Sequence, residues 1–65
     1  MRVSEAELVP GDLVFYGNPV TKIHHVGLYI GAGQMIDAPT FGKPVGVRPI
    51  RHRGDDFAGS DRVIN

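Results

Sequence analysis

The sequence contains no cysteine, no long apolar run and no excess of charge of either sign. Without cysteine there is no disulfide, and the redox compartment cannot be inferred from cysteine usage. No stretch approaches the roughly 18 apolar residues of a membrane-spanning helix, and the opening residues lack the apolar region of a secretory signal. Seven basic residues balance seven acidic ones, which argues against nucleic-acid binding. We therefore expect either a cytoplasmic chain or a piece of a longer protein whose targeting signal lies upstream.

Sixty-five residues form one domain at most. A chain of this length buries only about 60% of its unfolded surface, so its stability is marginal unless a disulfide, a metal or a partner contributes. Nine glycines and five prolines indicate many turns and short strands. Apolar runs between these turns predict strands at residues 13–16, 24–30, 34–38, 45–48 and 62–64, with one helical turn at 4–8, a turn at 40–44 and a polar loop at 51–60. The expected fold is mainly β, a small antiparallel five-stranded sheet or an SH3-like partial barrel.

The segment 24–38 predicts a hairpin around a three-residue loop, Gly31-Ala32-Gly33. In this register Ile30 faces Gln34, Leu28 faces Ile36 and Val26 faces Ala38. That face is apolar, so we expect it in the core. The opposite face carries His25, Gly27, Tyr29, Met35 and Asp37. His25 is the diagonal neighbour of Asp37, close enough for the two side chains to meet, and Gly27 leaves the space above them open.

Three motifs carry a resemblance to a known family. They are VPGDLVFYG at 9–17, HVGLYIG at 25–31 and QMIDAP at 34–39, followed by Arg62-Val63-Ile64 near the end of the chain. Their order and spacing resemble the NlpC-type peptidoglycan endopeptidases. The resemblance implies a papain-like α+β fold in which a cysteine on an N-terminal helix packs on a β-barrel. Residues 1–65 then form a single partial domain, the β half without the N-terminal helices.

The resemblance also implies roles for individual residues. His25 matches the catalytic histidine, and Asp37 falls at the third, polar position that orients the imidazole. Gly27, Tyr29 and Met35 are expected to line the substrate cleft. Family members hydrolyse peptide bonds in cell-wall stems, often between D-glutamate and a diamino acid, with no metal or other cofactor. Because the chain has no cysteine, we expect it to be inactive by itself, as a fragment, a truncated reading frame or a degenerate relative.

The expected partners follow from the same resemblance. Peptidoglycan stem peptides are the substrates of the family, which acts outside the cytoplasm at the cell wall. Without the helices, one side of the sheet leaves apolar residues uncovered, and such a surface favours a homodimer or a poorly folded monomer. The residues concerned are Leu13, Phe15, Val26, Leu28, Ile30 and Ile36.

Other interpretations remain open at this point. The chain is alternatively a non-catalytic peptidoglycan- or protein-binding module, or an SH3-like interaction barrel unrelated to cell walls. A metal set of His25, Asp37 and His52 has the right ligand types but fits no strong spacing motif. His24 is expected on the face opposite His25, with no role. Asp12 is expected to stabilise the turn that follows Pro10-Gly11.

Overall fold

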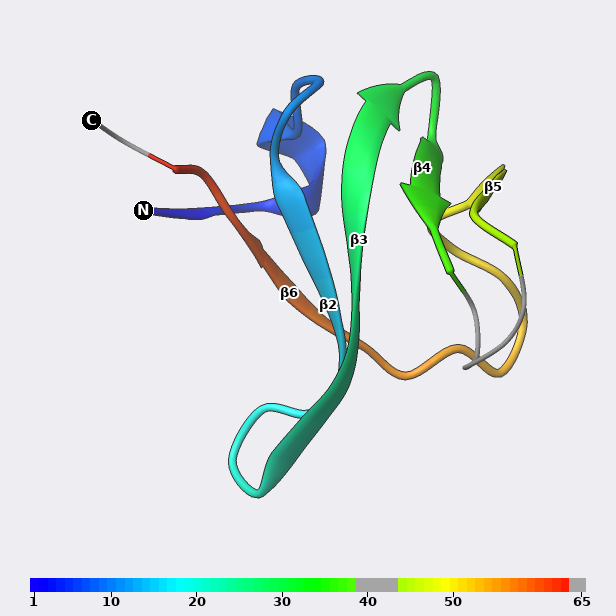
Figure 1. The fold of residues 1–65 in the computed structure, drawn as a ribbon. Coiled ribbons are helices and arrows are strands. Elements are labelled where there is room, and N and C mark those ends of the chain that lie inside the picture. The colour runs from blue at the N-terminus through cyan, green and yellow to red at the C-terminus, as the bar shows by residue number, and fades with distance from the viewer. Residues whose placement is uncertain (39–43, 64–65) are drawn as a thin grey trace.

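The computed structural model describes residues 1–38 and 44–63. The elements are β1 (Arg2–Val3), a 3-10 turn η1 (Glu5–Glu7), β2 (Leu13–Asn18), β3 (Lys22–Gly31), β4 (Gln34–Asp37), β5 (Gly46–Pro49) and β6 (Phe57–Asp61). They form one antiparallel sheet with the strand order β1-β6-β2-β3-β4-β5 (Figure 1). This confirms the mainly β prediction. In the described ranges, no helix combines the length and apolar character needed to cross a membrane.

Four of the five predicted strands are confirmed as β2 to β5, with ends that differ by a few residues. The predicted strand at 62–64 is wrong, because the last strand is Phe57–Asp61, inside the segment expected as a loop. Ser60 of β6 pairs with Val3 on one side and Val14 on the other. Glycine and serine are poor strand formers, so the ladder and not local propensity makes this segment a strand. Residues 40–43 of the turn predicted at 40–44, together with Pro39 and Ile64, lie outside the described residues.

A partly buried ion pair joins the segment before β2 to the residue that follows β6. Asp12 Oδ2 accepts a hydrogen bond from the Val9 N–H at 2.9 Å, which confirms the predicted turn-stabilising role. Arg62 donates from Nε and Nη2 to the two carboxylate oxygens of Asp12, at 2.8 and 2.9 Å. The hydrogen bonds from Arg62 and Val9 lower the pKa of Asp12 to about 2. The helical turn at 4–8 is confirmed as η1, where the Ser4 N–H donates to Glu7 Oε1 at 3.0 Å.

The hairpin between β3 and β4 differs by one residue from the predicted register at its turn. Leu28 faces Ile36 as predicted, but Gln34 faces Gly31 and not Ile30. Ala32 and Gly33 have φ angles of 55° and 74°, so the turn has two residues in the left-handed region. Two-residue turns of this hand match the twist of antiparallel strands, and the remaining residue, Ile30, is accommodated as a bulge.

The core lies on the side of the sheet that carries Val14, Tyr16 and Met35, and Ile50 completes it. The Tyr16 hydroxyl donates to the Ile50 carbonyl at 2.6 Å. Residue 50 directly follows β5, and β3 and β4 separate β5 from β2 in the sheet order. The sheet must therefore curl strongly, so that its two sides meet around the Tyr16 ring.

The face predicted to be the core is instead the open, convex one. Val26, Leu28 and Ile36 are 48%, 42% and 37% exposed. Leu13, Leu28, Ile36 and Val47 stand opposite one another across four strands, and we call them the apolar row. The prediction was wrong because alternation separates two faces but does not say which one the sheet curls around. Gly27 belongs to the inner face, where a Cβ atom would collide with the Met35 sulfur.

Candidate active site

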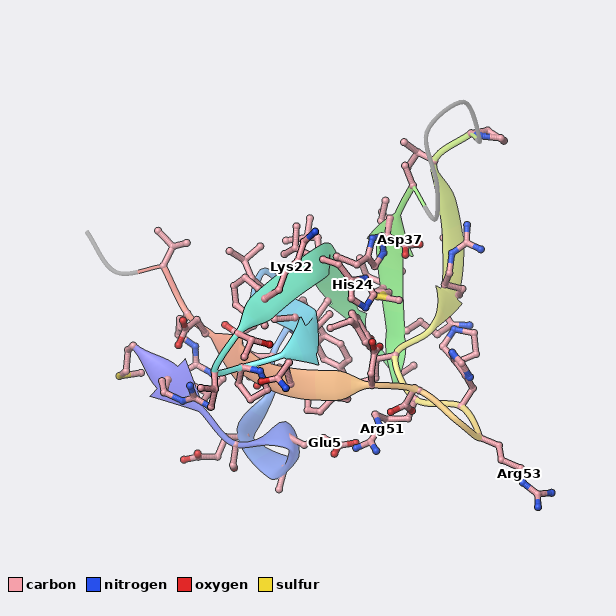
Figure 2. All side chains as sticks on the ribbon, turned by 90° about the horizontal axis from the view of Figure 1, so that it is seen from below. Glu5, Lys22, His24, Asp37, Arg51 and Arg53 are labelled. Carbon is pink, nitrogen blue, oxygen red and sulfur yellow. The ribbon has the colours of Figure 1, made fainter. Side chains whose placement is uncertain are left out.

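A β-bulge directs two consecutive histidines to the same side of the sheet. Tyr16 pairs with His25 and Gly17 pairs with Ile23, so His24 is the extra residue of β3. A bulge re-aims a side chain that strict alternation would place on the other face. The prediction that His24 faces away from His25 is therefore wrong. Figure 2 shows the labelled His24 and Asp37 on the same side of the sheet, and both line one cavity.

That cavity has a volume of about 310 Å³, and most of the residues around it carry a polar or charged group. Its walls come from β2, β3, β4, β5 and the segment before β6. The lining residues are Tyr16, His24, His25, Met35, Asp37, Arg48, Pro49, His52 and Asp56. Imidazoles, carboxylates and a guanidinium therefore share a concave site, which is a common feature of catalytic and binding sites.

The centre of the site is the contact between His25 and Asp37. His25 Nε2 lies 2.5 Å from Asp37 Oδ2. The Asp37 side chain is only 2% exposed, and its other oxygen, Oδ1, accepts a hydrogen bond from Arg48 Nε. A carboxylate only accepts hydrogen bonds, so Nε2 of His25 carries the proton. With its proton held on Nε2, the ring directs Nδ1 toward the cavity as the nitrogen that can act as a base.

The Tyr16 ring packs against the imidazole of His25. The two ring centroids are 5.8 Å apart, with an angle of 42° between the ring planes. Burial raises the pKa of Tyr16 to about 12, and the charges of Asp55 and Asp37 act in the same direction. Its hydroxyl is occupied by the Ile50 carbonyl. Tyr16 thus remains a neutral hydrogen-bond donor that fixes the floor of the site.

A second histidine–carboxylate pair lies at the exposed rim. His24 Nε2 is 2.5 Å from Asp56 Oδ2. The hydrogen bond from His24 lowers the pKa of Asp56. The Asp56 carbonyl also accepts the Gly17 N–H at 2.9 Å, so this pair connects the bulge to the segment before β6. Solvent-exposed ion pairs contribute little to stability. The main effect of this contact is therefore to shape the rim of the cavity.

The other residues named from the sequence occupy different places. Met35 lines the cavity, whereas Tyr29 does not, and its hydroxyl accepts the Gly33 N–H at 3.0 Å. Gly27 lies against the Met35 sulfur. His52 lines the cavity with His25 and Asp37. Nevertheless, across residues 1–38 and 44–63 no three histidine, aspartate or glutamate side chains are arranged to hold a metal ion.

Sequence reasoning missed Tyr16, His24, Arg48 and Asp56 as lining residues. The Gly17 position contained a usable signal, because glycine inside a strand often marks a bulge. No local sequence signal marked Arg48, because its contact with Asp37 depends on the pairing of β4 with β5.

Comparisons with known proteins give a consistent result. A family model described as the NlpC/P60 family matches residues 1–56. The probable endopeptidase p60 of Listeria grayi is 60% identical over 37 residues. The gamma-D-glutamyl-L-lysine dipeptidyl-peptidase of Bacillus cereus is 35% identical over 66 residues, which covers 95% of this chain. A crystal structure of an NlpC/P60 family protein from Bacillus cereus superposes on 95% of the chain with a TM-score of 0.84 and 33% identity.

The chain corresponds to a small part of each of these proteins. It spans 7% of the Listeria protein, 20% of the Bacillus cereus peptidase and 22% of the crystallised chain. A further relative, the peptidoglycan endopeptidase RipA of Mycolicibacterium smegmatis, is 38% identical over 53 residues, which is 82% of this chain and 10% of that protein. The similarity is therefore to one portion of larger hydrolases.

Proposed function

Because this chain belongs to the NlpC/P60 family, we propose that it is the C-terminal β-sheet portion of a peptidoglycan cysteine endopeptidase. In this proposal His25 and Asp37 are catalytic residues, and the thiol nucleophile is carried by a segment outside these 65 residues. The chain is inactive by itself, because no side chain in its sequence can form the thioester intermediate. The observation that carries the proposal is the contact between His25 Nε2 and Asp37 Oδ2 at the cavity wall.

The proton transfers follow from the orientation of the imidazole. Asp37 holds the Nε2–H, so Nδ1 of His25 takes the proton of the incoming thiol. The thiolate attacks the carbonyl carbon of the scissile peptide bond. When the C–N bond breaks, the protonated Nδ1 gives its proton to the departing amine. Water then attacks the thioester, gives a proton to Nδ1, and releases the acid and the thiolate.

The substrate class is proposed from the relatives together with the cavity. The names of the relatives specify peptidoglycan and gamma-D-glutamyl-L-lysine peptides. Cell-wall stem peptides lie outside the cytoplasm, so the complete enzyme acts there. Within the site, Met35 is the proposed apolar substrate contact, and Gly27 provides the space that its sulfur occupies. Tyr29 supports this contact indirectly, through the turn that ends at Gly33.

A chimera tests the proposal directly. The β portion of the Bacillus cereus peptidase is replaced by this chain, so that the cysteine segment of the relative and His25 share one polypeptide. The chimera is expected to hydrolyse a gamma-D-glutamyl-L-lysine peptide, while the chain alone does not. Replacing His25 with Gln is expected to lower kcat by about 10³-fold or more, since the general base is lost.

Lys22→Gln is the matched control, because Lys22 is an exposed residue of the same strand, outside the cavity lining (Figure 2). It is expected to leave kcat unchanged. A chimera that unfolds cooperatively but shows no hydrolysis would contradict the proposal, and so would a His25→Gln variant with full activity.

The apolar row gives the proposal a second, separate test. We propose that a part of the complete enzyme outside these 65 residues covers this row, and that a second copy of the chain covers it when the chain is alone. Sedimentation velocity is expected to show a dimer that Leu28→Glu converts to a monomer. Val20→Glu, at a 90% exposed position of the β2–β3 turn, is the control and leaves the dimer intact. A well-dispersed wild-type monomer at high concentration would refute the dimer.

A second candidate function is a non-catalytic module that binds stem peptides. It is favoured by the fact that this chain forms the cavity although its sequence has no cysteine. Addition of a stem peptide is then expected to shift the Met35 methyl and His25 ring resonances of the isolated chain in a saturable manner. No response at millimolar peptide would exclude the module, while hydrolysis by the chimera would still support the peptidase.

A further inference from the structure

Arg48 completes a chain of three contacts that crosses three neighbouring strands. His25 lies on β3, Asp37 on β4 and Arg48 on β5. His25 Nε2 contacts Asp37 Oδ2, and Arg48 Nε donates to Asp37 Oδ1. Each carboxylate oxygen therefore has its own partner. Rotation of the carboxylate about its Cβ–Cγ bond would break both contacts at once.

The register of β4 and β5 makes the contact of Arg48 with Asp37 a diagonal one. Asp37 faces Gly46, and Arg48 faces Met35. The Arg48 side chain therefore has to lean along β5 over Gly46 to reach Asp37. A Cβ atom at residue 46 would lie 3.0 Å from Arg48 Nη2, so a larger residue would push the guanidinium aside. Glycine at this position leaves the space that the guanidinium needs.

Burial explains why Asp37 needs a charged partner. Its side chain is 2% exposed, while the guanidinium side chain of Arg48 is 36% exposed. Removing a carboxylate from water is costly unless an opposite charge and hydrogen bonds compensate. A neutral imidazole supplies one hydrogen bond but no opposite charge. Arg48 supplies the charge, and its outer part keeps contact with water, which limits its own desolvation.

We propose that Arg48 is a positioning residue, which holds Asp37 as an oriented carboxylate so that His25 keeps its proton on Nε2 and presents Nδ1 to the nucleophile. This role rests on the proposed function, but its structural part is independent of hydrolysis. If Arg48 is removed, the buried carboxylate loses the permanently charged side chain that lies against its Oδ1 atom, and it turns toward solvent. The imidazole then loses its fixed tautomer.

The first test measures the His25 ring in the chain by itself. In the ¹⁵N-histidine-labelled chain, at a pH where the ring is neutral, the two ring nitrogens are expected to show a predominant Nε2–H tautomer. Arg48→Met is expected to give a mixture of both tautomers. Arg48→Lys keeps the charge and is expected to restore the tautomer in part. Arg53→Met is the matched control, because Arg53 is exposed and outside the cavity lining, and is expected to change nothing (Figure 2).

Gly46→Ala is a second variant that keeps the proposal testable if Arg48→Met does not fold. It retains the charge but displaces the guanidinium, so a smaller change of the tautomer ratio in the same direction is expected. In the chimera, Arg48→Met is expected to lower kcat by about 10- to 100-fold, the loss typical when the partner that orients a metal-ligating histidine is removed, with KM little changed.

The outcomes separate this inference from the proposed function. Folded Arg48→Met with an unchanged His25 tautomer would overturn the positioning role, even if the chimera is active. A raised KM with unchanged kcat would also overturn it, and would make Arg48 a substrate contact. A changed tautomer in the variant, together with a chimera that never hydrolyses peptide, would support the positioning role and contradict the peptidase.

Discussion

Replacing Gly17 with Ala is expected to disrupt the bulge on which the histidine arrangement depends. Gly17 has a φ of +131°, and a Cβ atom there would lie 2.5 Å from the Lys22 carbonyl oxygen and 3.0 Å from the His24 nitrogen. Both are backbone atoms of the facing strand, so no side-chain rotation relieves the collision. The strands must separate at the residue that places His24 beside His25.

Gly54→Ala is the matched control for this change. Gly54 also has a positive φ, +82°, but nothing lies within 4 Å of a Cβ atom there. Gly54→Ala is therefore expected to destabilise the protein only by placing alanine in the left-handed region, which costs about 1–2 kcal/mol. At Gly17 the φ of +131° lies far outside the left-handed well near +60°, so the backbone strain for alanine is expected at the upper end of the usual range, about 3 kcal/mol. Loss of the hydrogen bond from the Gly17 N–H to the Asp56 carbonyl adds about 1 kcal/mol.

Urea unfolding measures the loss of stability in the two variants. The free energy of unfolding is expected to fall by about 4 kcal/mol for Gly17→Ala and by about 1–2 kcal/mol for Gly54→Ala. A domain of this size often has only about 3–5 kcal/mol in total, so Gly17→Ala is expected to lose its cooperative transition. Equal losses for the two variants would refute the argument from the bulge. Unchanged His24 and His25 resonances in a folded Gly17→Ala variant would refute it as well.

Two further predictions follow from the buried polar contacts. Arg62→Met removes both hydrogen bonds to Asp12, whose pKa is about 2, below its unfolded value of 3.8. The stabilisation is present above the unfolded pKa and is lost as the pH falls through the folded one, so melting curves of wild type and variant are expected to differ most near pH 6 and to converge near pH 2. Tyr16→Phe leaves the Ile50 carbonyl buried without its donor and is expected to cost about 1–3 kcal/mol in urea unfolding. Tyr29→Phe, whose hydroxyl contact is exposed, is expected to cost less, and equal losses would contradict the difference in burial.

The sequence was sufficient to predict the strands whose signal is local. Residues 24–38 combine alternating apolar residues with a glycine-rich turn, and the facing of Leu28 and Ile36 followed from these alone. Proximity of His25 and Asp37 followed from the same hairpin. The segment 57–61 could not be recognised, because Gly59 and Ser60 become a strand only when β1 and β2 pair with them.

The direction of curl was the other feature that the sequence did not reveal. Both faces of the central hairpin contain apolar residues, and the pattern alone predicts the more apolar one as the core. The observed curl brings together residues that are far apart in the sequence, as the hydrogen bond from the Tyr16 hydroxyl to the Ile50 carbonyl shows. The β-bulge is equally hidden from the local sequence. The register shift between Tyr16 and Gly17 changes the face that His24 occupies, and no change in composition marks it.

The parts of the site differ in how far they depend on the rest of the chain. His25 and Asp37 are 12 residues apart, and Asp37 and Arg48 are 11 residues apart, so consecutive antiparallel strands supply all three. Tyr16 is the long-range element, since it contacts Ile50 from 34 residues away and lies beneath His25. The imidazole is therefore oriented by local pairing and supported by the same residue that closes the core. For this reason, a segment that brings a thiol to the cavity has only to dock beside a site that is already assembled.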